Sequence, residues 1–529
     1  FLLLPATYSY VLYRVQYPGT SVYRVRVCSA PGIRHVMGLC ASAAPVAPVG
    51  PAKAKNYYAQ QAAQKAEQRS REWASWDSHR GLDAHVVHGF AIATATSTKP
   101  GARDAVLEAY RVMDKRLALP MRGEKGATVM HNVTADILFV FVSPEYSVAA
   151  VSDALAECAA NVPIHGSSSA QGVFSWEGLH LATSPDNGTT TGGITIMGIA
   201  DDEGAYATNV QGFGDHQSVE AAATIAATTC QSKLNIGADL SAVFVNSSAG
   251  TSDRVMKAVR SVVGENVPLV GGSSGVGSDG TSSQFTALDC FTEGGVVVTL
   301  MTSTASVESR IIQPYEENVA PNNADGTASK RGMATEVELM MPASGASVCV
   351  LHKIDGKRAS DVFASWCDGS VGENMIWREG KEGNVRALTA SHPMRVTAAG
   401  AVESHIVECI RKNGDGSLVV SGAIAEGSVL ASQRHVNPSD GDDIARQNTL
   451  QTMAAALSEV TTAGALIVFS DEYRRFTTDA LKSIRVYMKD SNLPFCGMFA
   501  AQQISSTKSD GDSANSLSIQ ITLFKKNEK

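Results

Sequence analysis

Several features that define other protein classes are missing from this sequence. None of its nine cysteines forms a Cys-x-x-Cys pair or joins a Cys/His cluster with zinc spacing, which excludes a zinc-finger module. No run of 18 apolar residues occurs, so no helix is expected to span a membrane. The formal net charge is −8, without the basic surplus that nucleic-acid binding needs. We expect reduced thiols, several of them in the core, and no metal, cofactor or nucleic-acid partner.

Catalytic motifs are also missing. No G-x-S-x-G elbow surrounds any serine, and the glycine-rich run 272–277 lacks the lysine of a phosphate-binding loop. His165 lies two residues from Ser167, and such a pair could in principle transfer an acyl group, but a structural histidine is the favoured interpretation. We therefore predict that the protein is not an enzyme. A serine-dependent hydrolase or transferase is the lowest-ranked alternative.

The first 80 residues differ in composition from the rest. Residues 1–36 carry arginines and no acid, and we interpret them as translation upstream of the true start or as a targeting remnant. The first methionine, Met37, opens a segment 37–80 that contains an Ala/Pro-rich spacer and a polar helix over 56–77. Its start, Met37 to Ser42, matches the M-G-x-x-x-[ST] pattern for myristoylation of Gly38, with Cys40 placed for a palmitoyl chain. The pattern predicts a cytoplasmic protein that two acyl chains hold at the inner face of a membrane.

The strongest pattern is a phrase that occurs three times. It begins with a continuous run of β-formers, continues as a helix and ends in Pro-x-x-Gly. The three strands are expected at 136–143, 241–248 and 465–470, and the closing segments begin at Pro163, Pro268 and Pro494. A strand, a helix and a second strand joined by short loops favour parallel pairing and burial of both faces. Alternating strands such as Leu418–Ser421 look antiparallel, so we predict α/β architecture with mixed, largely buried sheets and helices packed outside.

In their order and spacing, these segments resemble the FIST family over residues 136–505. The resemblance depends on Asp136–Ser143 with Pro163–Gly166, on Pro268–Ser273, on Ile354–Ala359 and on Ala465–Ser470 with Pro494–Gly497. It implies a FIST N-terminal domain at 81–313 and a FIST C-terminal domain at 346–524, joined by a polar, Gly-rich linker at 314–345. It also implies a signal-transduction module that senses a small ligand, for which an amino acid is one candidate.

The expected ligand site lies in the repeated segments. Gly166, Ser167 and Ser168 form one expected loop, and Gly271, Gly272 and Ser273 form another, in which backbone N–H groups and hydroxyls could bind a carboxylate or phosphate. The structural alternative is a tight turn, in which glycine supplies the backbone angle and the serine hydroxyl bonds to a backbone group. Tyr473 and Arg474 follow the carboxyl end of the third strand, where α/β sheets bind ligands, and could stack on and pair with an acidic ligand.

A signalling-protein partner is the main alternative to a metabolite. The chain would then be an interaction adaptor, or a scaffold like the substrate receptors of ubiquitin ligases that some relatives form. Ligand screens would stay silent in that case, while pull-downs would recover a stoichiometric partner.

Overall fold

The structure is a computed structural model of the whole chain. It describes residues 9–17, 20–28, 89–435 and 453–526, the last two ranges with gaps at 123–127, 171, 182–191, 235–238, 277–280, 313–314, 318–329, 341–347, 368–370, 372–373, 390–391, 401–403, 423, 454, 460, 471–492, 501, 508–510 and 517–518. The chain divides into two compact units, Phe1–Ala63 and Gln64–Lys529. The first contains an antiparallel hairpin of β1 (Ser9–Tyr17) and β2 (Thr20–Cys28). The predicted acylation residues Gly38 and Cys40, and the helix expected over 56–77, lie outside the described residues.

The second unit contains a first six-stranded sheet around the repeated phrase. Its central strand β6 is buried at every position, as its unbroken run of β-formers predicts. Helix α3 (Val148–Ala159) connects β6 to β7, and the two strands pair in parallel. The sheet order is β15-β14-β7-β6-β10-β3. Its strands are β3 (Phe90–Ser97), β6 (Ile137–Val142), β7 (Ile164–Ser168), β10 (Ile194–Asp201), β14 (Ser283–Phe285) and β15 (Cys290–Thr292).

A second sheet and a third sheet repeat this order. The second runs β31-β30-β13-β12-β16-β11, and the third runs β9-β8-β29-β28-β32-β17. In both, the two strands of the phrase pair in parallel and all other neighbours are antiparallel, so the predicted parallel pairing is confirmed. The strands of the second sheet are β11 (Ala205–Gly212), β12 (Ala242–Ser247), β13 (Leu269–Ser273), β16 (Gly295–Thr302), β30 (Gln502–Thr507) and β31 (Gly511–Ser516). Those of the third are β8 (Gly172–Ser175), β9 (Gly178–Leu181), β17 (Ala305–Ile312), β28 (Thr462–Ser470), β29 (Phe495–Ala500) and β32 (Ile519–Lys526).

The three sheets exchange hairpins in a cycle. The strands β8 and β9 follow β7 of the first sheet along the chain, but they pair with β29 of the third. The strands β14 and β15 follow β13 of the second sheet and pair with β7 of the first. The strands β30 and β31 follow β29 of the third sheet and pair with β13 of the second. Each sheet is therefore completed by the chain segment that leaves another.

A hydrophobic core lies where the three sheets meet. Phe139 of the first sheet, Phe244 of the second and Phe524 of the third are in mutual aromatic contact. Leu466 and Met498 belong to the same cluster. Aromatic contacts of this kind add to the free energy of burial. The core therefore needs all three sheets.

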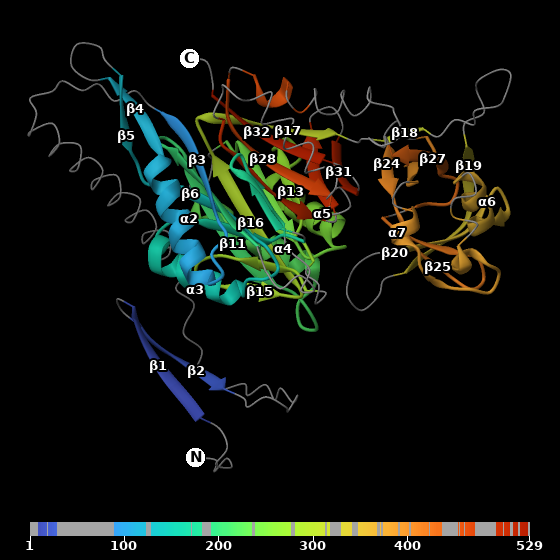
Figure 1. The fold of residues 1–529 in the computed structure, drawn as a ribbon, viewed down its shortest axis with the longest axis horizontal. Coiled ribbons are helices and arrows are strands. Elements are labelled where there is room, and N and C mark those ends of the chain that lie inside the picture. Colours follow the sequence, from blue (N-terminus) through green and yellow to red (C-terminus); the bar gives the residue numbers. More distant parts are fainter. Residues whose placement is uncertain are drawn as a thin grey trace, which may run out of the picture. The chain divides into compact units, whose positions relative to one another are not determined.

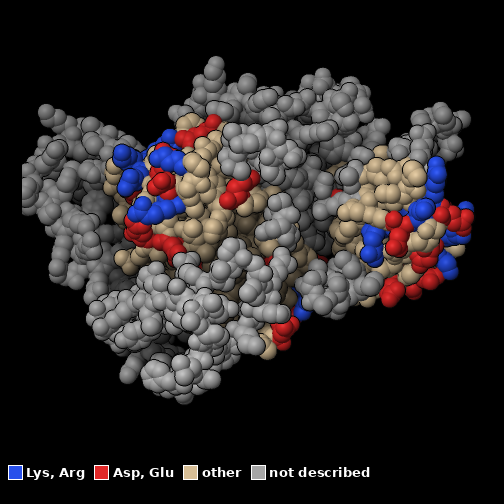
Figure 2. Space-filling view, turned by 60° about the horizontal axis from the view of Figure 1, so that its bottom comes forward, with Lys and Arg blue, Asp and Glu red and all other residues tan. Residues whose placement is uncertain are grey.

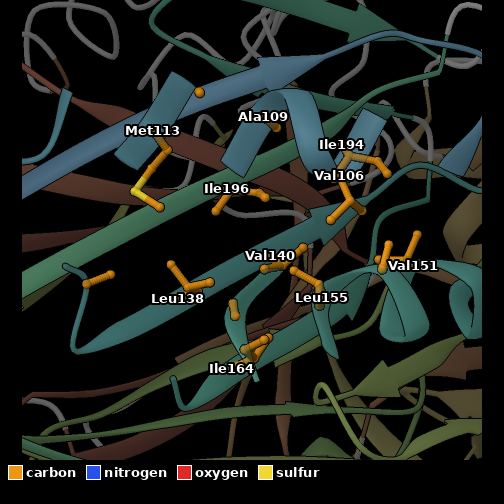
Figure 3. Packing of buried hydrophobic residues seen from close by; sticks show 14 of the residues in the cluster. Val106, Ala109, Met113, Leu138, Val140, Val151, Leu155, Ile164, Ile194 and Ile196 are labelled. Atoms are coloured by element: carbon orange, nitrogen blue, oxygen red, sulfur yellow. The ribbon is translucent and has the colours of Figure 1, made fainter. Parts of the chain in front are cut away.

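Helices cover the outer faces of the first two sheets. On the first sheet, α2 (Ala102–Arg116) and α3 direct Val106 and Leu155 toward Val140 and Ile196 of the strands (Figures 1 and 3). On the second, α4 (Val219–Lys233) and α5 (Ser252–Val263) cover a similar apolar layer. The hairpin β4 (Ala118–Arg122) and β5 (Thr128–Asn132) follows α2. No helix within the described residues has both the length and the apolar character to cross a bilayer.

A further sheet is inserted between β17 and β28 of the third sheet. Its main path is β22-β25-β26-β20-β19-β27-β23-β24, with α6 (Ala359–Trp366), η3 (Met375–Trp377) and α7 (Arg386–Thr389) beside it. Asp355 and Gly356 both have positive φ in the turn between β20 and β21, as an Asp-Gly pair in a two-residue hairpin turn favours. The strands are β18 (Tyr315–Glu317), β19 (Arg331–Met340), β20 (Val348–Ile354), β21 (Lys357–Arg358), β22 (Gly383–Asn384), β23 (Met394–Thr397), β24 (Ser404–Val407), β25 (Cys409–Lys412), β26 (Leu418–Ser421) and β27 (Val429–His435).

The architecture confirms the predicted α/β class with mixed sheets, but the sheets do not follow the predicted domain limits. Strands from 81–313 and from 346–524 pair with each other in the second and third sheets. The division at 314–345 therefore does not separate two independent sets of sheets. Sequence reading missed this because pairing between strands some 200 residues apart leaves no local signal.

Candidate functional site

A buried polar network lies between the first and second sheets. His165 of β7 is 1% exposed, and its Nε2 lies 2.8 Å from Asn246 Oδ1. The Asn246 amide nitrogen donates to the Gly272 carbonyl oxygen at 3.2 Å, so its oxygen must accept, and His165 Nε2 carries the hydrogen. His165 Nδ1 then accepts from Thr299 at 2.9 Å, and Thr299 accepts from Thr208 at 2.8 Å. With both ring nitrogens occupied, His165 is the structural histidine that the sequence favoured and is not a base for Ser167.

The neutral state of His165 makes the stability of the fold pH-dependent. Burial lowers its pKa to about 4, whereas the unfolded chain keeps a value of about 6.5. The unfolded state therefore binds the proton first as pH falls, so the contribution is present above about pH 6.5 and is lost progressively toward pH 4. We expect the free energy of unfolding to fall by about 3 kcal/mol over that window, from urea titrations at several pH values. His165→Gln should remove this part of the slope, and an unchanged slope would contradict the assignment.

The serine segments that sequence reading placed in loops lie in strands. Ser167 and Ser168 belong to β7, and Ser273 belongs to β13. The carboxyl ends of the two strands meet: Ser167 donates to the Ser274 hydroxyl at 2.8 Å, and Ser168 donates to the Gly275 carbonyl oxygen at 2.7 Å. The expected loops are therefore strand segments, and Ser167, Ser168 and Ser273 are buried.

The glycines of these segments have a packing role. A side chain at Gly166 would overlap the ring of Phe285, which lies opposite on the exchanged strand β14. Gly497 of β29 lies opposite Phe174 of β8 in the same way. Gly271 has φ +138°, and an added Cβ would overlap the carbonyl oxygen of Val245. The absence of a side chain therefore lets the exchanged strands and the parallel partner approach closely.

A second polar group of residues lies at the carboxyl end of β12, where α5 begins. Ser247, Ser252 and Gln284 are each 0% exposed. The Ser247 and Ser252 hydroxyls and the Gln284 amide nitrogen have no hydrogen-bond partner. The Gln284 oxygen lies 3.4 Å from the Ser248 hydroxyl, which places this amide beside the segment that leads into α5. Buried polar groups are normally satisfied, so three of them at one helix start indicate a place for a polar ligand.

The first sheet provides an internal comparison. Val142 occupies the place of Ser247 in the first sheet. The backbone N–H of Ser169 donates to the Val142 carbonyl oxygen, just as the backbone N–H of Ser274 donates to that of Ser247. In the third sheet, Val173 occupies the place of Gln284. Val173 precedes Phe174, which lies opposite a glycine of β29, just as Gln284 precedes Phe285, which lies opposite a glycine of β7. Helix α3 is capped by Ser147, whereas no side chain caps α5 at Thr251. At the described equivalent places in the other two sheets, the side chains are apolar or hydrogen-bonded. The group of polar side chains without hydrogen-bond partners is therefore specific to the second sheet.

The charges near α5 restrict what this group could bind. Arg254 pairs with Glu220 through two contacts of 2.5 and 2.7 Å, and this pair lowers the pKa of Glu220 to about 2. Asp253 adds an acid to the first turn. Arg254 is thus already engaged, and the remaining donors are hydroxyl and amide groups at the positive end of a helix dipole. Such a set suits a single carboxylate better than a multiply charged phosphate.

Other expected site residues fall elsewhere. Tyr473 and Arg474 lie outside the described residues. Cys496 is fully buried, and burial raises the pKa of its thiol, so it is an inert core residue, as are Cys230, Cys349, Cys367 and Cys409. The sequence analysis placed Ser247 within the expected strand 241–248 and did not single out Ser252 or Gln284. Only the recurrence of Ser247 at the place of Val142 offered a signal.

A groove lies on the surface beside α2 and α3. Its volume is about 500 Å³, and its walls carry both signs of charge, including the ion pairs Lys99–Glu108 and Arg103–Glu157. On the face that Figure 2 shows, Lys and Arg side chains are likewise intermixed with Asp and Glu. Mixed charges do not attract a polyanion, so the interior group at α5 is the better candidate site.

The fold and the interior polar groups define an α/β protein whose candidate site lies between repeated sheets. Residues 136–319 match the family model of the FIST N domain, a domain associated with signal transduction and sensing. The earlier resemblance is confirmed in this segment. No curated protein matches the sequence. Among solved structures, PurLQS from Thermotoga maritima is similar at 8% identity over 83% of this chain and 73% of its own, but its TM-score of 0.18 does not establish a shared fold.

Proposed function

We propose that this protein is a signal-transduction sensor that binds a small, carboxylate-bearing ligand at the start of α5. The observation that carries the proposal is the group of Ser247, Ser252 and Gln284, which is buried and unsatisfied inside the FIST N domain. The donors of these side chains and the helix N-terminus would complement one carboxylate. A free amino acid is one such ligand. No catalytic role is proposed, because His165 is bonded to Asn246 and Thr299 and not to a serine.

Calorimetry with matched variants tests the site. Ser247→Val and Gln284→Val install the residues found at the equivalent places, Val142 and Val173, so the fold is expected to tolerate them. Against a panel of amino acids and monocarboxylates, we expect the unmodified chain to bind at least one compound. Each variant should weaken that binding about tenfold, the effect of losing one or two hydrogen bonds. Ser261→Ala, on the last turn of the same helix, is the control and should bind normally.

Two results would contradict this proposal. A flat response over the whole panel would argue against a metabolite sensor, and recovery of a stoichiometric protein partner in parallel would favour the adaptor. Binding that both valine variants retain in full would show that the ligand lies elsewhere.

We further propose that acylation of Gly38 and Cys40 holds the sensor at the cytoplasmic face of a membrane. The proposal depends on the sequence pattern at Met37, since a single myristoyl chain binds membranes only marginally and a second chain makes the attachment stable. Metabolic labelling of a chain that starts at Met37 with a myristate analogue tests it. Absence of label, with Gly38→Ala as the background control, would remove the tether.

A further inference from the structure

The inserted sheet contains an arginine without a partner. Arg395 lies on β23, partly exposed, and its Nε is shielded from solvent with no hydrogen-bond partner. No ion pair to Arg395 occurs among the residues that the structure describes. A guanidinium is charged at every physiological pH, and shielding its Nε from water without a hydrogen-bond acceptor is costly. A site for an anion is the simplest way in which this cost would be met.

A second arginine on the same face, Arg331, has the carboxylate partner that Arg395 lacks. Arg331 and Arg395 both lie directly opposite Ala431, one on each side of β27. Arg331 makes a bidentate pair with Glu317, at 2.6 and 2.7 Å. The two arginines therefore share one sheet face and one neighbour, but the protein supplies a carboxylate only to Arg331.

Gln433 adds a complementary group beside Arg395. It lies two residues beyond Ala431 on β27, so it is a diagonal neighbour on the same face, with Cα atoms about 7–8 Å apart. Its side chain is 0% exposed, and its amide nitrogen donates to the carbonyl oxygens of Ala431 and Ser432, at 3.4 and 3.2 Å. Its Oε1 has no donor. A cation without an anion thus lies next to an acceptor without a donor.

The position of this face supports a binding role. Ile406 lies opposite Arg395 on β24 and belongs to the core cluster that contains Phe469 and Leu523 of the third sheet. The face therefore packs at the junction of the inserted sheet and the third sheet, and junctions of this kind often hold ligands. Glu408, the diagonal neighbour on the other side, is buried and has contacts of its own. Its carboxyl group disfavours a dianion.

We propose that Arg395 and Gln433 bind a small monocarboxylate that carries a hydrogen-bond donor next to its carboxylate. The carboxylate would pair with the guanidinium of Arg395, and the donor would satisfy Oε1 of Gln433. The site is separate from the group at α5 and does not depend on it.

Calorimetry on the full chain with three probes tests this site. Glycolate carries a carboxylate and a hydroxyl donor, acetate lacks the donor, and inorganic phosphate carries more charge. We expect glycolate to bind about tenfold more tightly than acetate, as one hydrogen bond to a buried acceptor would give, and more tightly than phosphate. Gln433→Leu should remove the preference for glycolate over acetate, and Arg395→Met should abolish binding of both.

Matched variants keep the outcome interpretable. Arg331→Met removes the same charge from the same face and should leave glycolate binding intact. If Arg395→Met does not fold, Arg395→Lys keeps the charge but loses the planar fork, and should weaken binding about tenfold. The site is refuted if glycolate does not bind at millimolar concentration, if Arg395→Met binds it normally, or if Arg331→Met weakens it as much.

Discussion

A chain that ends at residue 313 is expected not to fold cooperatively, although it contains nearly all of the FIST N domain match at 136–319. Without the segment after 313, the hairpin β8–β9 has no sheet, β13 loses its neighbour β30, and the central core loses one of its three sides. We expect urea titration followed by circular dichroism to show no cooperative transition for this fragment, whereas the full chain should show one.

The magnitude follows from the residues that the third sheet adds to the core. Leu466, Val468, Met498 and Phe524 are all in the central cluster, and each contributes about 1.5–3 kcal/mol on burial. Together they contribute roughly 6–12 kcal/mol, which is comparable to the whole stability of a typical domain, about 5–15 kcal/mol. The loss would therefore leave little net stability.

Complementation gives this experiment a positive control. Coexpression of residues 436–529 as a separate chain supplies β28 to β32, the strands of the second and third sheets that the fragment lacks, and should restore the transition. A fragment ending at 313 that unfolds cooperatively by itself, with the slope that its length predicts, would show that the exchanged hairpins are not essential.

The parts of the fold that sequence reading predicted are local. The run Ile137–Val142 specifies a buried strand, Ala359–Trp366 specifies a helix, and Asp355-Gly356 specifies a turn, because each depends on neighbours a few residues away. The exchange of hairpins depends on pairs such as Val173–Met498, which are more than 300 residues apart. The periodicity of apolar residues along the sequence does not indicate such long-range pairs. The boundary predicted near 313 followed from the family resemblance and from the polar, Gly-rich composition of residues 314–345.

The candidate site could be predicted only in part, because it too depends on contacts between residues far apart in the sequence. The recurrence of Ser167 and Ser273 after matching strands indicated that these segments lie together, and Ser167 does reach Ser274. Their glycines also suggested loops, but Gly166 and Gly271 lie within strands because an exchanged or parallel strand covers each of them. Gln284 and Arg395 looked like ordinary polar residues. Only the three-dimensional neighbours show that each has an atom without a partner.

Gly271→Ala is expected to cause a large loss of stability for a single added methyl group. Gly271 has φ +138°, which an L side chain rarely adopts, and its new Cβ would overlap the carbonyl oxygen of Val245 on the parallel strand β12. Both atoms belong to backbone, so no side-chain rotation relieves the overlap. Strain of this kind and overpacking together should lower the free energy of unfolding by about 4 kcal/mol, measured by urea titration.

Two other glycines separate the causes of this loss. Gly264 has φ +83° and ψ 169° with no atom near its added Cβ, so Gly264→Ala should cost about 1–3 kcal/mol for the backbone angles alone. Gly214 has open space and an ordinary angle, so Gly214→Ala should change stability by less than about 0.5 kcal/mol. The excess of Gly271→Ala over Gly264→Ala then measures the close approach of β12 and β13. If the two variants lose equal stability, the glycine serves the backbone angle only, and the approach of the strands does not require it.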